Sequence, residues 1–435
     1  MITLNYSSLQ KIAPEHGISQ AELDSVSVKL PEYLQNIHAR NQGFYSDDVL
    51  CNHNLFNDIQ QFSNSVRGKY ETIVLLGIGG SALGTIALRE AFGHSAFGVR
   101  PRLIVLDNID PDFIAETLES LELKKTLFLV ISKSGGTPEI VAHYFFFSQQ
   151  IRNAHLEEKN HFVFITGKTG ILREEAEKKH IPTFPIPENV GGRFSVLTAV
   201  GLLPAALIGL DIYQLVAGAK EMRDIFLSED PEKNSVFQLA SIQYLLRNKG
   251  KNINVMYPYA HKLFRIADWF RQLLAESTGK KYDTKRNEIF TGLTPIAALG
   301  ATDQHSQNQL YFDGPNDKLF LFVKTERFTN TVQIPAPDDE RLSYLKHLDF
   351  GALLHTEMEG TQGALTKVNR PHITISISEI SEKNIGALFL LFEGATAFLG
   401  EFLHINAFDQ PGVELSKHIT KELLLRKLCK TIKAV

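Results

Sequence analysis

"LLGIGGSALG", residues 75–84, is the stretch that decides how the rest of the chain is interpreted. The apolar run "TIVLL" enters a glycine-rich turn and is followed by a helical pattern, so a strand, a turn and a helix are predicted. Gly77, Gly79 and Ala82 also satisfy the G-x-G-x-x-A dinucleotide fingerprint, and Asp107 stands where a ribose-binding acid is expected. The stretch therefore fits a turn that holds either a dinucleotide or a smaller phosphorylated ligand.

Further apolar runs follow this one at spacings that leave room for helices: "RLIVLD", "TLFLVIS", "HFVFIT" and "TFPIP". Continuous apolar runs are typical of parallel strands that helices cover on both faces. The stretch 181–192, with three prolines and a Gly-Gly pair, is the best candidate for an interdomain connection, and a second series of strands and helices follows it. We predict an α/β protein with mainly parallel sheets, a ligand cleft at the carboxyl ends of strands, and a helical tail from about residue 381.

Composition narrows the class of partner. The chain has 435 residues, 43% of them hydrophobic, and a formal net charge of −4, which is typical of a globular protein and gives no basic surface for nucleic acid. The most apolar run, residues 196–210, contains Pro204 and is shorter than the roughly 20 residues that span a membrane, so it predicts a core helix. Cys51 and Cys429 have no disulfide or zinc spacing. We expect a cytoplasmic protein with neither nucleic-acid nor membrane partners.

A second glycine-rich turn, within "LVISKSGGTPEIV" at 129–141, carries three hydroxyl groups, on Ser132, Ser134 and Thr137. Backbone N–H groups at a helix N-terminus, together with hydroxyls, form a phosphate site that the helix dipole favours. The alternative is that these side chains only cap the helix, but one cap requires one hydroxyl. Three hydroxyls beside Lys133 favour the phosphate site.

The two turns together bear on the choice of ligand. A single pyrophosphate requires no second hydroxyl-rich turn, which weakens the dinucleotide interpretation of the first turn. The alternative for Gly79, Gly80 and Ser81 is a tight turn followed by a serine that caps the helix. The residues alone leave these alternatives open.

A candidate general base lies in "ADWFRQLLAESTGKK", residues 267–281. Ile266, Trp269 and Leu273 form one helical stripe, and Glu276 lies at its edge, close to a helix end predicted around Gly279. Partial burial and the negative end of the helix dipole both disfavour the anion, so Glu276 is suited to proton transfer. The alternative is an exposed glutamate at a helix end.

Three more residues could take part in chemistry, although none carries a reaction alone. His305 lies in the polar stretch "ATDQHSQNQL", Arg193 follows two glycines in "NVGGRFS", and Lys417 lies in "NAFDQPGVELSKHI". Their alternatives are a surface histidine, a salt bridge at a domain junction and a solvated helix lysine.

Taken in order, several of these motifs resemble the phosphoglucose isomerase (glucose-6-phosphate isomerase) family between about residues 70 and 420. The motifs are "LLGIGGSALG", "VISKSGGTPE", "VGGRFSVLTAVGLLPAAL", "LLAESTGKK", "ATDQHSQ" and "NAFDQPGVELSK". "VGGRFS" and "FDQPGVE" are highly specific, whereas the serine-rich turn is shared with many SIS-type sugar-phosphate domains. The chain departs from longer family members in being short and in having Pro411 where a tryptophan is common. "FDQPGVE" argues against the bifunctional phosphoglucose/phosphomannose isomerases.

The resemblance implies roles for the candidate residues. Glu276 would move a proton between carbons 2 and 1, Arg193 would stabilise the cis-enediol(ate), and His305 with Lys417 would open the sugar ring. The residues implied to bind the substrate are Gly80, Ser81, Ser132, Lys133, Ser134, Thr137 and Gln410.

The resemblance also implies a fold and an activity. It implies two SIS-like α-β-α sandwich domains, at 50–190 and 191–405, an N-terminal helical segment, 1–49, packed on the second domain, and a helical tail, 406–435, carrying Lys417. The implied activity is the interconversion of glucose 6-phosphate and fructose 6-phosphate in glycolysis and gluconeogenesis. It needs no cofactor, and a homodimer is implied in which His305 reaches the partner's site. No His, Cys or acid cluster has metal-ligand spacing. The alternative is a non-catalytic SIS regulator that binds a sugar phosphate.

Overall fold

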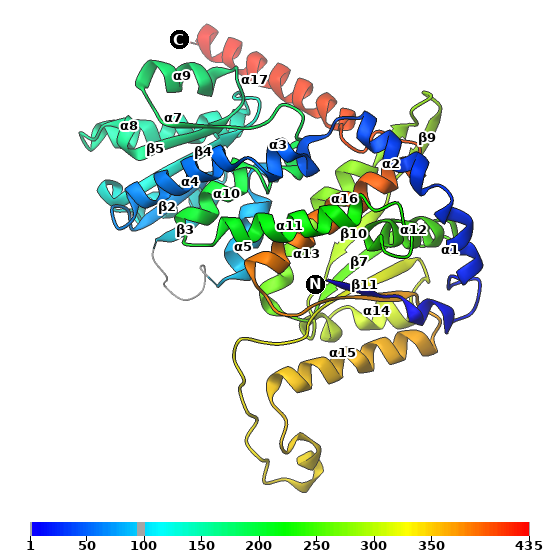
Figure 1. Ribbon diagram of the computed structural model, residues 1–435. Helices are drawn as coiled ribbons and strands as arrows, with labels where there is room; N and C mark the ends of the chain where they lie inside the picture. Colours follow the sequence, from blue (N-terminus) through cyan, green and yellow to red (C-terminus); the bar gives the residue numbers. More distant parts are fainter. Residues whose placement is uncertain (1, 94–100, 435) are drawn as a thin grey trace.

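The computed structural model describes residues 2–93 and 101–434, with side chains described up to residue 427. It is an α/β structure with two five-stranded sheets and a C-terminal helix, which confirms the predicted fold class (Figure 1). The first sheet is entirely parallel and has the order β3-β2-β4-β5-β6. Its strands are β2 (Thr72–Leu76), β3 (Arg102–Leu106), β4 (Thr126–Ser132), β5 (Phe162–Thr166) and β6 (Thr183–Pro185).

The order of this sheet determines where a ligand can bind. The chain passes from β2 to β3 on one side and then to β4 on the other, so the strand order reverses between β2 and β4. Loops that leave neighbouring strands in opposite directions open a crevice at the carboxyl ends of those strands. The two glycine-rich turns follow β2 and β4, and they therefore flank this crevice.

The second sheet has the order β1-β12-β11-β7-β10, and all its strands are parallel except β1. The sequence pattern did not predict β1, because three residues are too few to show periodicity. A separate antiparallel pair, β8–β9, follows α13 (Phe264–Thr278). The strands are β1 (Thr3–Asn5), β7 (Ile253–Pro258), β8 (Lys280–Tyr282), β9 (Glu288–Thr291), β10 (Thr294–Ala297), β11 (Lys318–Thr325) and β12 (His372–Ile377).

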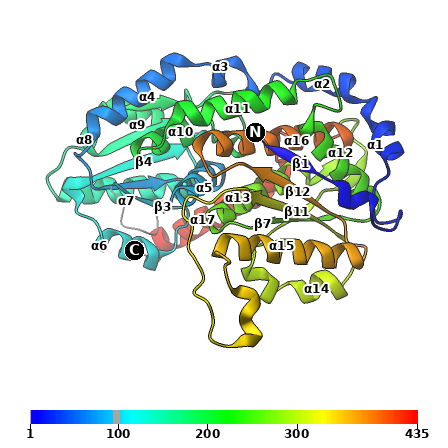
Figure 2. The same ribbon diagram turned by 60° about the horizontal axis from the view of Figure 1, so that its bottom comes forward.

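Buried helices lie between the two sheets and form the largest core (Figures 1 and 2). The apolar run at 196–210 contains α10 (Ala199–Leu207), every residue of which is buried, as predicted. Within the described residues, α16 is the one helix long and apolar enough to cross a membrane, and its apolar window is wholly buried inside the protein. These helices are α5 (Leu83–Ala91), α10 (Ala199–Leu207), α11 (Ile212–Phe226), α13 (Phe264–Thr278) and α16 (Glu382–Phe402).

Of the remaining helices, α14 and α15 lie on the outer face of the second sheet (Figure 2), and α7 and α9 pack on the face of the first sheet opposite the central core. In contrast, α2, α4 and α12 add buried side chains to that core. The remaining helices are α1 (Gln20–Ser27), α2 (Leu30–Ala39), α3 (Asp47–Leu50), α4 (His53–Val66), α6 (Pro111–Glu119), α7 (Pro138–Asn153), α8 (Glu158–His161), α9 (Ile171–Lys179), α12 (Ser235–Asn248), α14 (Asn308–Asp313) and α15 (Phe350–Lys367).

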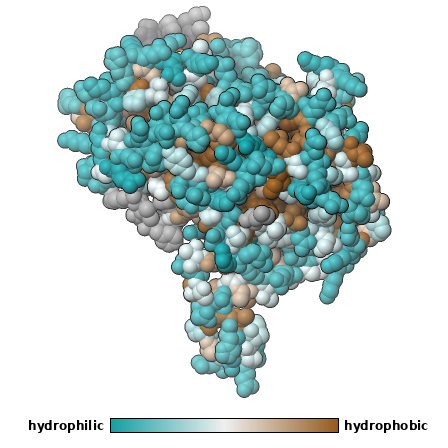
Figure 3. All heavy atoms as spheres, in the orientation of Figure 1, coloured by the Kyte–Doolittle hydropathy of each residue, from teal (hydrophilic) through white to brown (hydrophobic). Residues whose placement is uncertain are grey.

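Two segments project from this body. The chain between β11 and α15, residues 326–349, forms an arm that extends away from the second sheet (Figures 1 and 2), and hydrophobic atoms lie on its surface (Figure 3). The last helix, α17 (Glu414–Ala434), is exposed along its described side chains. The predicted helical tail from about residue 381 therefore divides into a core helix, α16, and an exposed helix, α17.

Candidate active site

The hydroxyl-rich turn after β4 forms a compact cluster. Ser132 Oγ lies 2.8 Å from Thr137 Oγ1, and Ser134 Oγ lies 3.4 Å from each of these two oxygens. Thr137 is the N-cap residue of α7, but its side chain does not cap the helix by a hydrogen bond. The hydroxyls therefore gather at the positive end of α7 without serving as its cap, which is the arrangement that suits an anion.

The segment 166–170 supports this turn, a role that the sequence analysis missed. Thr166 Oγ1 donates to the carbonyl of Ser132, 2.8 Å away, and the Gly167 N–H donates to the carbonyl of Lys133. A Cβ atom on Gly170 would lie 2.5 Å from the Ser134 carbonyl oxygen, and the φ of Gly170 is +103°. The glycine pattern "TGKTG" was the signal, because a close backbone approach requires glycine.

Lys133 connects the hydroxyl cluster to the next segment of the site. Its Nζ donates to the carbonyls of Glu188 and Val190, both at 2.8 Å. Burial lowers the pKa of Lys133, and the carboxylate of Glu188 acts in the opposite direction. The structure therefore places this ammonium group against the chain that leads to Arg193.

The first glycine-rich turn packs against protein, which accounts for its glycines. A Cβ atom on Gly80 would lie 2.2 Å from the carbonyl carbon of Gly192, and one on Gly79 would lie 2.9 Å from the side-chain nitrogen of Gln272. In a dinucleotide fingerprint, the second glycine leaves room for the pyrophosphate. Gly79 holds that position here, but it faces the side chain of Gln272 on α13. Ser81 is not the cap of α5, whose N-cap residue is Ala82, so the capping alternative is wrong.

Arg193 is the most constrained cation in the site. Only 2% of its side chain is exposed, and each guanidinium nitrogen has a partner. Burial lowers the pKa of Arg193, while the carboxylates of Glu276 and Asp409 act in the opposite direction. Its partners are Ser277 Oγ (2.7 Å), Gln410 Oε1 (2.9 Å), Glu276 Oε2 (3.4 Å) and the carbonyls of Ala407 (2.6 Å) and Asp409 (3.1 Å).

Glu276 lies in the last turn of α13, at the edge of the buried stripe, as predicted. Its side chain is 35% exposed. One carboxylate oxygen lies 3.4 Å from Arg193, and the other accepts from Gln272 at 3.1 Å. A carboxylate that is held by an arginine and still reaches the surface is placed to exchange a proton with a bound ligand.

The structure thus brings together Arg193, Glu276 and Gln410, whose sequence positions span more than two hundred residues. It adds Ser277, Lys280 and Asp409, which the sequence analysis did not single out as site residues. Lys280 Nζ donates to the carbonyls of Glu276 and Ser277 and lies 3.8 Å from Asp409 Oδ1. All three residues lie inside motifs already quoted, so motif membership was the available signal.

The structure does not bring the other two predicted residues to this cluster. His305 is exposed at the end of a 3-10 turn, Thr302–His305. Lys417 lies on the exposed helix α17, where its Nζ pairs with Glu414 Oε1 at 2.7 Å. Within the described part of a single chain, neither side chain shares a hydrogen bond or ion pair with Glu276 or Arg193.

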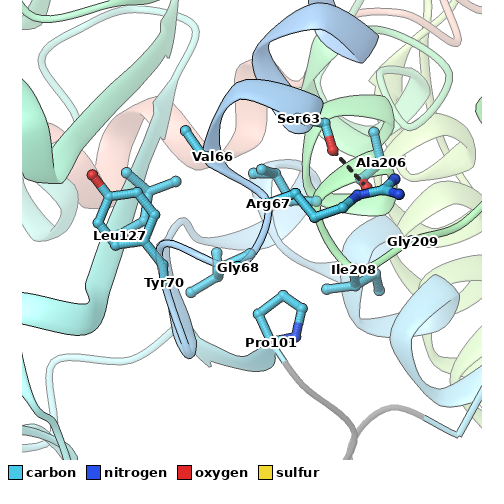
Figure 4. Close-up of a pocket in the computed structure, with 12 residues that line it drawn as sticks. Ser63, Val66, Arg67, Gly68, Tyr70, Pro101, Leu127, Ala206, Ile208 and Gly209 are labelled. Atoms are coloured by element: carbon cyan, nitrogen blue, oxygen red, sulfur yellow. Dashed lines mark hydrogen bonds between the residues drawn. The ribbon is translucent and has the colours of Figure 1, made fainter.

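A different cavity, of about 190 Å³, is lined by Tyr70, Pro101 and Leu127, which lie at the amino ends of β2, β3 and β4 (Figure 4). It is lined largely by apolar groups, and Ser63 Oγ at its wall donates to the carbonyl of Ala206 at 2.9 Å. Among the described residues that line it, Arg67 is the one ionic side chain. The described lining residues include no acid–base pair. Across the residues that the structure describes, no three His, Cys, Asp or Glu side chains gather into a group that could hold a metal ion.

Comparison with known proteins identifies one family over most of the chain. The phosphoglucose isomerase family model matches residues 53–339 and 356–432. The chain is 40% identical over 426 residues to glucose-6-phosphate isomerase of Carboxydothermus hydrogenoformans, covering 94% of this chain and 91% of the relative. It is 36% identical over 434 residues to glucose-6-phosphate isomerase of Rubrobacter xylanophilus, covering 96% and 97%.

Solved structures share the whole fold. A crystal structure of a hypothetical protein from Thermus thermophilus matches with a TM-score of 0.87 at 34% identity, covering 98% of this chain and 100% of that one. Glucose-6-phosphate isomerase of Chlamydia trachomatis matches with a TM-score of 0.85 at 22% identity, covering 98% and 94%. The fold and site define a double-sheet α/β protein with a hydroxyl-rich turn at the start of α7 and a carboxylate–guanidinium pair at the end of α13. The chain belongs to the phosphoglucose isomerase family.

Proposed function

We propose that this protein interconverts glucose 6-phosphate and fructose 6-phosphate. The observation that carries the proposal is the cluster of Glu276, Arg193 and Gln410, in which a partly exposed carboxylate lies 3.4 Å from a buried guanidinium. An aldose–ketose shift requires a base for a carbon-bound proton and a cation for the oxyanion that develops. The relatives' names, glucose-6-phosphate isomerase, support an isomerisation of glucose 6-phosphate.

The proposed steps follow from these groups. Once the sugar is in its open-chain form, the Glu276 carboxylate removes the proton from carbon 2 of glucose 6-phosphate, and the electrons of that bond form the cis-enediol(ate). Arg193 stabilises the negative oxygen, and Gln410 lines the same pocket. The hydroxyl proton of oxygen 2 moves to the negative oxygen 1, and protonated Glu276 returns its proton to carbon 1, so that carbon 2 becomes the ketone and carbon 1 carries the hydroxyl group of fructose 6-phosphate. One carboxylate performs both transfers.

We assign the phosphate group of the substrate to Ser132, Ser134 and Thr137, whose hydroxyls lie within 3.4 Å of one another at the start of α7. Gly80 and Ser81 approach the sugar from the first turn. Lys133 remains a proposed binding residue that contributes positive charge behind the hydroxyls, since its ammonium group is bonded to the carbonyls of Glu188 and Val190.

We further propose a homodimer in which the partner supplies His305, which with Lys417 opens the sugar ring. Exposed apolar side chains on α17 and on the arm support the proposed dimer, because exposed apolar patches usually mark interaction sites. On α17, Leu415, Ile419 and Leu423 share one face and are 67%, 46% and 51% exposed. On the arm, the exposed side chains are Val332 (56%), Leu342 (40%) and Tyr344 (69%).

The proposed activity can be tested on the purified protein after EDTA treatment. We expect fructose 6-phosphate to be converted to glucose 6-phosphate, detected by a coupled dehydrogenase, with no metal or nicotinamide added to the isomerase itself. The groups assigned to the reaction are side chains of the chain, so chelation should leave the rate unchanged. A rate lost with EDTA and restored by zinc or manganese would contradict the cofactor-free mechanism, and absence of turnover would favour the regulator alternative.

The shared site can be tested by mixing two inactive variants, Glu276→Gln and His305→Ala. When the two variants are unfolded and refolded together in equal amounts, about half of the dimers contain one chain of each. If His305 crosses the interface, each of these mixed dimers has one site with both residues intact. We expect about a quarter of the wild-type activity under this pairing. If a size tag shows that mixed dimers form and no activity returns, His305 serves its own chain.

The domain limits at residues 49/50, 190/191 and 405/406 and the cytoplasmic location remain predictions. Limited proteolysis that cuts within 181–192 and leaves two folded fragments would support the central limit.

A further inference from the structure

Lys280 is a buried ammonium group next to the proposed base. Only 4% of its side chain is exposed. Its Nζ donates to the carbonyls of Glu276 at 2.6 Å and Ser277 at 2.9 Å, which belong to the last turn of α13. The last carbonyls of a helix have no partner within the helix, and a cation at that end also offsets the negative end of the dipole.

The same ammonium group faces the segment 406–410 from the other side. Asp409 Oδ1 lies 3.8 Å from Lys280 Nζ, and Asp409 Oδ2 accepts from Asn406 at 2.9 Å. The carbonyl of Asp409 accepts from Arg193, whose Nη1 bonds to Gln410. Lys280 therefore lies between the backbone that carries the base and the backbone that carries the other half of the site.

We infer that Lys280 is a positioning residue, an inference that rests on the proposed isomerase function. Its ammonium group fixes the end of α13 against segment 406–410 and so sets the separation between Glu276 and the Arg193–Gln410 pair. A misplacement of about 1 Å at a reacting group can cost about 100-fold in rate. The substrate phosphate is assigned to a different turn, so the contribution of Lys280 falls on kcat rather than KM.

The surroundings of Lys280 also make the contact sensitive to pH. Burial lowers the pKa of Lys280 to about 8, and the charge of Arg193 acts in the same direction, while Asp409 and Glu276 oppose it. These are the charged groups that face it from the neighbouring elements. The opposite strand, β9, presents the uncharged Thr291, whose hydroxyl accepts from Arg247 of α12. Above about pH 8 the ammonium group loses its charge, and its attraction for Asp409 and for the helix carbonyls weakens.

The test compares Lys280→Met and Lys280→Arg with Lys281→Met. Lys281 is the adjacent lysine, 48% exposed and paired with Glu288 at 2.9 Å, so it is a matched control. For each protein, kcat and KM for fructose 6-phosphate are measured between about pH 6 and pH 10, with thermal unfolding as a check on folding. In the wild type we expect kcat to fall above about pH 8. Lys281→Met should show the same values and the same fall.

Lys280→Met should lower kcat by about 10- to 100-fold and abolish the fall near pH 8, with KM within about twofold of wild type. Lys280→Arg should keep part of the activity and move the fall to higher pH, because a guanidinium stays charged. Wild-type kcat in Lys280→Met, or a fall at an unchanged pH in Lys280→Arg, overturns the inference. If Lys280→Met does not fold, Lys280→Arg decides alone. An inactive wild type instead overturns the proposed function on which the inference rests.

Discussion

Glu276→Gln is expected to lower kcat for fructose 6-phosphate by about 10²- to 10⁴-fold while the protein still binds a phosphorylated sugar. Glutamine has nearly the same size and can keep the hydrogen bond with Gln272 or Arg193 through its amide oxygen. It cannot accept a proton from carbon, so the loss falls on the chemical step. In free energy this is about 3 to 5 kcal/mol of transition-state stabilisation.

The matched control is Asp268→Asn on the same helix, α13. Asp268 is also a carboxylate, but it is paired with Arg265 and Arg271 about two turns before Glu276. We expect this variant to keep wild-type turnover. Binding is measured with glucitol 6-phosphate, which has no carbonyl group to enolise. Turnover near the wild-type value in Glu276→Gln removes Glu276 from the mechanism.

Arg193→Ala is expected to lower kcat by about 10²- to 10³-fold, with a smaller loss of affinity for glucitol 6-phosphate. The guanidinium is proposed to act on negative charge that exists only during the reaction, so its removal affects the transition state more than the bound ground state. The comparison of kcat with inhibitor affinity measures this difference.

Arg193→Lys keeps the positive charge but changes the hydrogen-bonding geometry, so it tests the two contributions separately. The guanidinium is fixed by five hydrogen bonds and a lysine cannot reproduce its planar fork, so we expect an intermediate rate. Because Arg193 also bonds to the carbonyls of Ala407 and Asp409, thermal unfolding of both variants is compared with wild type. Equal losses of kcat and inhibitor affinity in a folded Arg193→Ala protein would make Arg193 a phosphate ligand instead.

Much of the fold follows from patterns within single segments. The apolar runs that became β2, β4 and β5 are buried along their whole length, so helices on both faces could be inferred from them, whereas the edge strand β3 is exposed at Arg102 and half-buried at Ile104. β1 could not be inferred in this way, since its three residues form a strand only by pairing with β12. The projecting arm, 326–349, was also missed, because an extended segment without its own core has no periodicity to detect.

In the candidate site, too, local features could be predicted from the sequence, whereas contacts between distant segments could not. The helical stripe around Glu276 and the hydroxyls of the second turn are local features, and the structure places both as predicted. The contact of Arg193 with Gln410 joins positions far apart in the chain, and no local pattern specifies it. Lys280 was overlooked for a related reason: a lysine beside another lysine suggests a solvated surface, whereas tertiary packing buries the first and exposes the second.

The most direct test of the central claim, that Glu276 moves a carbon-bound proton, is isomerisation in D₂O followed by proton NMR. Fructose 6-phosphate is incubated with enzyme through many turnovers, so that the proton held by Glu276 has repeated opportunities to exchange with solvent. We expect wild type to reach equilibrium with deuterium at carbon 2 of glucose 6-phosphate and Glu276→Gln to incorporate almost none in the same time. Isomerisation to equilibrium without deuterium at that carbon, or equal incorporation by Glu276→Gln, would contradict the account.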